Sequence, residues 1–170
     1  MLDCQAAEVA RVKKFESGVI RDPITVPPDM TIRQVIDLTR SKGISGVPVV
    51  QGSKVVGIVT HRDLRLEVKL DAPVSTVMTP KERLVTVREN APKDEVLLLL
   101  HKHRIEKLLV VDDRYRCIGL ITVKDIEKAV TYPNATKDSV GRLRVAAATT
   151  VGDKGFERSE ALLAAECDVI

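Results

Sequence analysis

An internal repeat in the middle of the chain constrains the fold more than any other feature of the sequence. Each copy contains a short β-branched segment, a helical stretch and two further apolar segments in the same order. The last segment reads Gly57-Ile-Val-Thr-His-Arg-Asp63 in the first copy and Gly119-Leu-Ile-Thr-Val-Lys-Asp125 in the second. Because the match extends through every element, we expect two copies of one small structural unit.

Each copy is predicted to fold as strand, helix, strand, strand and helix. In the first copy, Thr31 and Gln34 form a capping-box pair, and Gly43 is placed to end the same helix in the left-handed conformation. In the second copy, Asn90 or Ala91 is expected to cap a helix that has Pro92 in its first turn. Turn-like residues at 51–54 and 112–114 predict a hairpin in each copy. One copy alone buries too little apolar surface, so we expect the two to pack sheet to sheet.

The segments on either side of the repeats have a different pattern. An amphipathic helix is predicted from residue 6 to residue 17, ending at Gly18, and the initial strand segments of the repeats are predicted at 23–26 and 84–87. After the repeats, we predict a strand at 142–148, a helix at 157–167 and the start of a second strand at 168–170. This order is a βαβ unit interrupted at its second strand. We therefore divide the chain into residues 1–18, 19–76, 77–131 and 132–170.

Composition narrows the function classes. The 27 basic and 24 acidic residues are interspersed, and there are only two Tyr, two Phe and no Trp, so nucleic-acid binding by a basic, aromatic surface is not expected. The longest apolar run, residues 96–100, is too short to span a membrane. Three widely spaced cysteines without metal-ligand spacing predict ordinary thiols in a reducing cytoplasm.

The residues with the strongest functional potential are Thr60-x-x-Asp63 and Thr122-x-x-Asp125, each directly after a predicted hairpin strand. Such a pattern is typical of a helix N-cap. It is also suited to a nucleotide, because a carboxylate accepts two ribose hydroxyls while the Thr hydroxyl and the helix N–H groups face phosphate.

Other residues near the same strand ends are weaker candidates. The strand glycines Gly57 and Gly119 indicate either a tight sheet contact or a close approach to a ligand. Four basic side chains could contact phosphates, although each could equally be a solvated surface charge: His61, Arg62, Lys107 and Lys124. We expect no metal site, because two histidines at positions i and i+2 of a helix, His101 and His103, point in different directions.

The doubled Gly-h-h-Thr-x-x-Asp-h pattern, in which h is hydrophobic, resembles the signature of cystathionine β-synthase (CBS) repeats. Residues 19–130 resemble a Bateman module, an α+β (α/β-like) fold in which two repeats, each a small sheet with two helices, pack about a pseudo-twofold axis. The resemblance implies that Thr and Asp contact the ribose and phosphate of adenine nucleotides. The implied residues are Thr25, Thr60 and Asp63 for one cleft, and Thr86, Thr122 and Asp125 for the other.

The flanking segments are similar to those of bacterial inosine-5′-monophosphate (IMP) dehydrogenases, over residues 5–18, 22–24, 104–108, 132–138, 141–145, 157–165 and 168–170. This similarity implies that the flanks are pieces of a (β/α)8 barrel, which in that family oxidises IMP to xanthosine monophosphate with NAD and a monovalent cation. None of the chain's cysteines lies in the family's Gly-Ser-x-Cys-like loop. We therefore expect no catalytic residue and no dehydrogenase activity in this chain.

Two hypotheses of different classes follow. In the first, the chain is a regulatory module that binds purine nucleotides, with ATP and its Mg²⁺ as the ligand and no cofactor for chemistry. Its expected partners are the catalytic barrel and further copies of itself, through CBS–CBS contacts. In the second, it is a structural association module in which Asp63 and Asp125 only cap helices. An enzyme in its own right is the weakest alternative, because we find no nucleophile–base pair or metal cluster.

Overall fold

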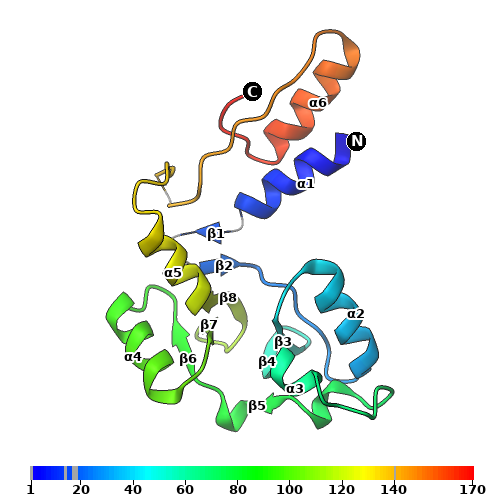
Figure 1. Ribbon diagram of the computed structural model, residues 1–170, viewed down its shortest axis with the longest axis vertical. Helices are drawn as coiled ribbons and strands as arrows, with labels where there is room; N and C mark the ends of the chain where they lie inside the picture. The colour runs from blue at the N-terminus through cyan, green and yellow to red at the C-terminus, as the bar shows by residue number, and fades with distance from the viewer. Residues whose placement is uncertain (1, 14, 17–18, 140) are drawn as a thin grey trace. The chain divides into compact units, whose positions relative to one another are not determined.

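The computed structural model describes residues 2–13, 15–16, 19–139 and 141–170, which form two compact units (Figure 1). The central unit is the continuous segment Asp22–Val123. The terminal unit is built from both ends of the chain, Met1–Arg21 and Lys124–Ile170. Helices and small sheets occur in one chain, which agrees with the predicted α+β class.

The first repeat of the central unit contains α2 (Ile32–Lys42), β3 (Gly46–Gln51), β4 (Lys54–Thr60), α3 (His61–Leu64), the 3-10 helix η1 (Val74–Thr76) and β5 (Thr79–Pro80). Its three strands form one antiparallel sheet in the order β3-β4-β5. The predicted initial strand at 23–26 is reduced to a single parallel bridge between Val26 and Val49.

The ends of α2 follow directly from its sequence. The Gln34 N–H donates to the Thr31 hydroxyl at 3.3 Å, and the Thr31 N–H donates to the Gln34 side-chain oxygen at 3.1 Å. Gly43 ends the helix at φ 62°, in the left-handed region that glycine adopts without a steric penalty. The predicted capping box and helix end are therefore confirmed, and they turn Ile32 and Val35 into the interior.

The second repeat contributes the 3-10 helix η2 (Lys81–Arg83), β6 (Thr86–Arg88), α4 (Lys93–His103), β7 (Lys107–Val111) and β8 (Cys117–Thr122), and α5 (Val123–Thr131) follows directly. β6 is parallel to β7, and β7 is antiparallel to β8. The prediction that Asn90 or Ala91 caps α4 was wrong, because Pro92 itself is the cap, with an extended ψ of 142°. The helix therefore begins at Lys93, one residue later than an Ala91 cap and two residues later than an Asn90 cap would place its start.

Both predicted hairpins are present, and they share an irregularity. The β3–β4 pairing shifts register between Val49 and Val50, and the β7–β8 pairing shifts between Val110 and Val111. A bulge at the same place in both repeats increases the local twist of each hairpin. The local geometry therefore repeats along with the sequence.

The two hairpins meet at their turns. The Val55 N–H donates to the Tyr115 carbonyl at 3.1 Å, and a bridge joins Lys54 to Arg116. The Lys81 ammonium lies 4.6 Å from the centroid of the Tyr115 ring, a cation–π distance. The Val55–Tyr115 bond and the Lys54–Arg116 bridge link the two repeats, whereas the Lys81–Tyr115 contact lies within the second repeat.

The interior of the central unit is aliphatic. One cluster of buried side chains belongs to the first repeat: Val26, Ile32, Val35, Val47, Val49, Val59, Leu64 and Val74. The second repeat buries Val87, Val96, Leu100, Leu108, Leu109, Val110, Val111, Leu120 and Ile121. The hairpin strands thus supply about half of these core residues, and several of those are β-branched.

The terminal unit contains α1 (Leu2–Lys13), β1 (Phe15–Glu16), β2 (Val19–Arg21) and α6 (Asp153–Ala164), and α1 lies beside α6 (Figure 1). The helix predicted at 6–17 was wrong at both ends. It extends to Leu2, and it stops at Lys13 because Phe15 pairs with Ile20 in a short hairpin, which overrides the helical pattern. The predicted end at Gly18 lies outside the described residues.

The predicted βαβ order is present in a reduced form. Instead of a strand at 142–148, the structure has isolated β-bridges. One of them pairs Ala146 with Val169 in parallel, and α6 connects the two bridged segments along the chain. The helix predicted at 157–167 begins earlier, at Asp153, and ends at Ala164. The N-cap of this helix is Gly152, at φ 82°. Because glycine has no polar side chain, a sequence pattern of polar cap residues does not predict this helix start.

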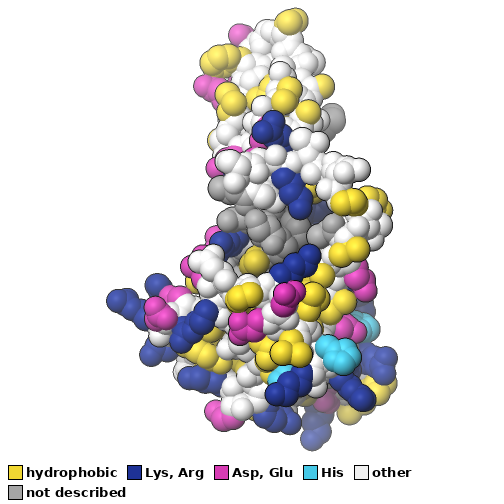
Figure 2. All heavy atoms as spheres, turned by 90° about the vertical axis from the view of Figure 1, so that its left-hand side faces the viewer, with side chains coloured by type: hydrophobic (Ala, Val, Ile, Leu, Met, Phe, Trp, Pro, Cys, Tyr) yellow, Lys and Arg dark blue, Asp and Glu magenta, His cyan; other side chains and the backbone are white. Residues whose placement is uncertain are grey.

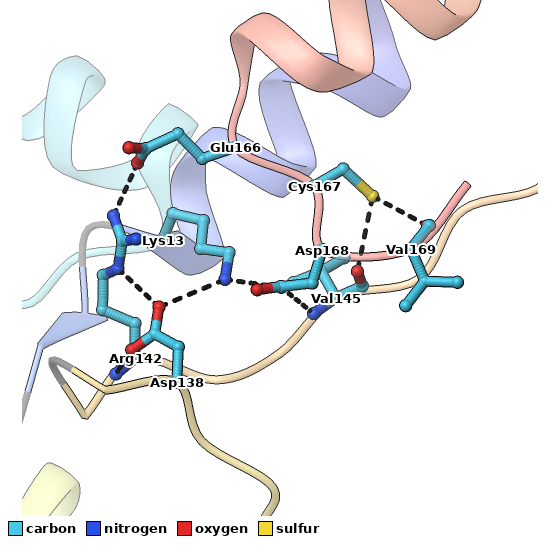
Figure 3. A network of polar contacts seen from close by, with 8 residues as sticks. All are labelled: Lys13, Asp138, Arg142, Val145, Glu166, Cys167, Asp168 and Val169. Carbon is cyan, nitrogen blue, oxygen red and sulfur yellow. Dashed lines mark hydrogen bonds and ion pairs between the residues drawn. The ribbon is translucent and has the colours of Figure 1, made fainter.

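A cluster of ion pairs in the terminal unit surrounds one buried lysine (Figure 3). The Lys13 side chain is 3% exposed, and its ammonium lies 2.6 Å from Asp168 and 3.5 Å from Asp138. Arg142 contacts Asp138 at 2.9 Å and Glu166 at 2.5 Å. The cluster therefore joins the end of α1 to two segments from the other end of the chain.

No helix in the described ranges is both long and apolar enough to cross a bilayer. On the face shown in Figure 2, acidic and basic side chains are interspersed with hydrophobic ones, as the nearly balanced composition predicts.

Candidate functional site

The first candidate site lies where β4 passes into α3. Thr60 is the last residue of β4 and Asp63 is in the first turn of α3. Both the backbone N–H and the hydroxyl of Thr60 donate to Oδ2 of Asp63, each at 2.8 Å. Both side chains are half-buried, so the carboxylate is neither enclosed in the core nor directed into bulk solvent.

These bonds give Asp63 the helix-capping role that the Thr-x-x-Asp pattern predicts. Because both bonds end on Oδ2, they do not use Oδ1, and a carboxylate has acceptor capacity on both oxygens. The His61 N–H donates to the Ser45 carbonyl at 2.9 Å, which fixes the start of α3 to the residue before β3. The strand-to-helix junction is therefore rigidly defined by backbone and side-chain bonds.

Thr25 lies on a neighbouring segment. It is exposed and precedes Val26, whose N–H donates to the Pro48 carbonyl at 3.0 Å and whose carbonyl accepts from Val50 at 2.9 Å. The structure thus places Thr25 beside β3, and it joins Thr60 to Asp63 by hydrogen bonds. We call Thr25, Thr60 and Asp63 the first signature site.

In the sequence, the equivalent positions are Thr86 and Thr122, which lie in the central unit, and Asp125, which lies in the terminal unit; the second signature site is our name for this sequence pattern. Thr86 begins β6, and the pairing of Val87 with Val110 repeats the Val26–Val49 bridge of the first repeat. Thr122 is half-buried at the end of β8, and Asp125 is half-buried in the first turn of α5.

A backbone bond confirms the equivalence of the two strand ends. The Val123 N–H donates to the Glu106 carbonyl at 3.0 Å, as His61 does to Ser45. Thr122 pairs with Lys107 across its hairpin, as Thr60 pairs with Gly46. Position 46 of the first repeat therefore corresponds to position 107 of the second.

The basic candidates differ in their surroundings. His61, Arg62 and Lys124 are exposed. The Lys107 side chain is only 9% exposed, and its ammonium lies 4.0 Å from the Glu106 carboxylate. Of these four basic residues, Lys107 is the one whose side chain is packed against neighbouring residues.

Gly57 has a structural explanation. A Cβ atom at this position would lie 2.5 Å from the Met78 sulfur and 2.8 Å from the Thr79 carbonyl oxygen. β5 therefore approaches β4 too closely for a larger residue, since Gly57 pairs with Pro80. The tight sheet contact, one of the two alternatives from the sequence, accounts for this glycine.

Gly46 was missed by the sequence analysis. A Cβ atom there would lie 3.2 Å from both Cδ and Cε of Lys107 and 3.1 Å from the Val59 carbonyl oxygen. The alignment of Gly46 with Lys107 could have revealed an asymmetry between the repeats. It could not have revealed that the two residues contact each other.

Cys117 lies in an environment that disfavours its reactive thiolate form. Burial is the main cause that raises the pKa of the Cys117 thiol to about 11, and the negative charge of Asp22 adds to it. This thiol is therefore protonated at neutral pH. In the described part of the chain, no three His, Cys, Asp or Glu residues are grouped to hold a metal ion.

Comparison with known proteins agrees with the repeated geometry. The family model "CBS domain" matches residues 12–69 and 74–132. The chain belongs to the CBS domain family. The Thr-x-x-Asp segments of both CBS domains fall inside the matched ranges.

Relatives of this CBS pair are longer proteins. The chain is 54% identical over 170 residues to inosine-5′-monophosphate dehydrogenase of Escherichia coli (strain K12), and 48% identical over 170 residues to the protein of that name from Haemophilus influenzae. Each match covers 99% of this chain and 35% of the relative, so the chain spans about a third of the length of these relatives.

Solved structures give a similar result. A GMP reductase from Trypanosoma brucei in complex with guanosine 5′-triphosphate superposes with a TM-score of 0.86 at 28% identity, over 99% of this chain and 42% of that chain. The C318A variant of that enzyme in complex with guanosine 5′-monophosphate gives a TM-score of 0.85, also at 28% identity, over 99% of this chain and 37% of that chain.

Proposed function

We propose that this CBS pair is a regulatory module that binds purine nucleotides, with ATP and its Mg²⁺ as the ligand. The observation that carries the proposal is the bonding of Asp63 at the end of β4. Thr60 holds the carboxylate through Oδ2, so Oδ1 would accept a ribose hydroxyl at a fixed position. The sequence repeats the same residue pattern at Thr122 and Asp125.

The comparisons support a purine ligand. The relatives carry the name of an enzyme that acts on inosine 5′-monophosphate, and the solved neighbours are complexes with guanosine 5′-monophosphate and 5′-triphosphate. Because two thirds of each relative lies beyond the matched region, the chemistry would reside outside this chain.

The parent activity is part of the proposal. In an IMP dehydrogenase, the remaining barrel would oxidise IMP to xanthosine monophosphate with NAD and a monovalent cation, in the cytoplasm. Nucleotide binding to the CBS pair would act on that reaction by favouring one arrangement of CBS pairs from different subunits over another. Only a difference in affinity between the two arrangements can produce such regulation.

Isothermal titration calorimetry tests the binding claim. The purified chain is titrated with ATP, GTP and S-adenosylmethionine in the presence of Mg²⁺. We expect ATP to bind saturably and S-adenosylmethionine, which lacks phosphate, to bind weakly or not at all. The absence of binding by all three at millimolar concentration contradicts the proposal.

A substitution separates a ligand site from a helix cap. Asp63→Ala should weaken ATP binding by about 1–3 kcal/mol, the cost of a lost charged hydrogen bond. Thr31→Ala is the matched control, because it removes a cap from α2 without touching either signature site. It should lower stability and leave ATP affinity unchanged. Equal losses of affinity in both variants would indicate a general effect of destabilisation.

A structural association module is the second candidate function, and one observation favours it. Oδ2 of Asp63 is already engaged as a cap, which is the only role this hypothesis gives the residue. It predicts that light scattering detects the same oligomer with and without ATP, in the native chain and in Asp63→Ala. An oligomer that changes with ATP excludes it.

A further inference from the structure

The contact between Gly46 and Lys107 makes the two signature sites unequal. Lys107 belongs to β7 of the second repeat, yet its Cδ and Cε atoms lie against β3 of the first repeat, 3.2 Å from where a Gly46 side chain would begin. A larger residue at position 46 would fit only if the lysine stem or the Val59 carbonyl moved by a few tenths of an ångström.

The stem reaches the face of the first hairpin that carries Thr60. Gly46 and Thr60 are directly paired in the antiparallel β3–β4 hairpin. Directly opposed residues of such a pair project on the same face of the sheet, with Cβ atoms about 5 Å apart. The lysine stem therefore lies on the face of the hairpin where the Thr60 hydroxyl bonds Asp63.

The reverse contact does not exist, because the residue that corresponds to Lys107 in the first repeat is Gly46, which has no side chain. The Lys107 stem is 9% exposed, so its position is set by packing. A lysine whose stem is already held by packing loses little side-chain entropy when its ammonium binds an anion.

We propose that Lys107 of the second repeat is a phosphate-binding residue of the first signature site, and that Gly46 is the positioning residue that admits it. This inference rests on the proposed nucleotide-binding function and deepens it. The first signature site would then favour ligands that carry negatively charged phosphates. The second signature site would receive no equivalent positive charge, because position 46 is a glycine.

The carboxylate of Glu106 lies near the Lys107 ammonium and would partly offset its positive charge. Its carboxylate lies 4.0 Å from the Lys107 ammonium and is 69% exposed. A pair of this length with one largely exposed partner contributes little, so Glu106 would be a weak competitor of an arriving phosphate. Glu106→Gln should therefore raise ATP affinity slightly, by less than about threefold, and a fall in affinity would contradict the assignment.

The charge is tested with Lys107→Met, which keeps a long stem and removes the ammonium. Calorimetry with ATP and with adenosine compares the native chain, this variant and Lys102→Met, an exposed lysine of α4 that changes net charge equally. We expect ATP affinity to fall roughly tenfold in Lys107→Met alone, while adenosine affinity is unchanged. Equal losses for ATP and adenosine would show that Lys107 acts only through packing, and would overturn the inference.

The assignment to the first site is tested in single-site backgrounds. In Asp125→Asn, where the first site remains intact, Lys107→Met should still weaken ATP binding. In Asp63→Asn, where the second site remains intact, it should have no effect. The opposite pattern would show that Lys107 serves its own repeat.

The role of Gly46 is tested by a double-mutant cycle. Gly46→Ala should weaken ATP binding when Lys107 is present, because the new methyl group displaces its stem. The same change should have no effect on ATP affinity in a Lys107→Ala background, where the stem is absent. Additive effects would overturn the positioning role.

If the native chain binds no ATP, the proposed function fails. If ATP binds equally to the native chain and to Lys107→Met, only this inference fails.

Discussion

The interior of the central unit and the interior of the terminal unit are stabilised by different kinds of interaction. The first repeat alone packs eight buried aliphatic residues into one cluster. The buried cluster of the terminal unit consists of Val9, Leu162 and Cys167, next to the buried ammonium of Lys13. Aliphatic packing is non-directional and insensitive to pH, whereas ion pairs depend on geometry and on protonation. The two units should therefore respond to different perturbations.

The largest effect is expected from a cavity in the central unit. Ile32 is fully buried, so Ile32→Ala should lower the free energy of unfolding by about 2–5 kcal/mol. Amide hydrogen exchange should accelerate in β3 and β4, while the amides of α1 and α6 keep their protection. Ile24→Ala, at a position 37% exposed, is the control and should change little. Equal loss of protection in both units would contradict their separate stabilisation.

The next effect concerns the ion cluster of the terminal unit. Lys13→Met removes a buried cation and leaves Asp168 and Asp138 without it. Exchange of amides in α1 and α6 should accelerate roughly tenfold or more, and those of β3 and β4 should not change. Arg11→Met breaks the exposed pair with Glu8 and serves as the control, because surface pairs contribute little. If the two variants behave alike, the buried cluster is not important for stability.

A smaller effect distinguishes the two repeats inside the central unit. α2 ends at Gly43 with φ 62°, but α4 ends at Arg104 with φ 52°, in the same left-handed region. Because left-handed backbone costs a residue with a Cβ atom about 1 kcal/mol, Arg104→Gly should stabilise the chain by up to that amount in urea denaturation. Gly43→Arg should destabilise it. A stabilising Gly43→Arg would show that side-chain contacts outweigh backbone strain here.

The smallest effect should appear on acidification. The hydrogen bond from Lys13, followed by that from the Val145 N–H, lowers the pKa of Asp168 below its ordinary value of 3.8. A lowered pKa means that the stabilisation is fully present above 3.8 and is lost as pH falls through the folded-state pKa. NMR titration of the Val145 amide should follow this loss, and Asp168→Asn should abolish it. A midpoint above 3.8 would contradict the assignment.

The sequence was sufficient to predict features that depend on local chemistry. The capping box at Thr31, the left-handed Gly43 and both hairpins follow from residues within a few positions of each other, and all are confirmed. Features that depend on distant partners were predicted less well. The end of α1 at Lys13 is set by the β1–β2 pairing, and the start of α6 by a glycine with φ 82°.

The candidate site divides in the same way. The bond between Thr60 and Asp63 is local, at a spacing of three residues, and the Thr-x-x-Asp pattern predicted its capping geometry. The contact between Gly46 and Lys107 joins two repeats, and no pattern within either repeat contains it. Sequence periodicity could identify the elements of each repeat, but it could not show which side chains cross between them.

The hydrogen bond from Val55 to Tyr115 has a consequence for how the central unit forms. It connects the turns of two hairpins that are far apart along the chain, so each hairpin must exist before the bond can close. Folding should then have a fast local phase followed by a slower encounter of preformed halves, as expected where non-local contacts limit the rate. Substitutions at this junction would act mainly on the speed of that encounter if the junction is already formed in the transition state.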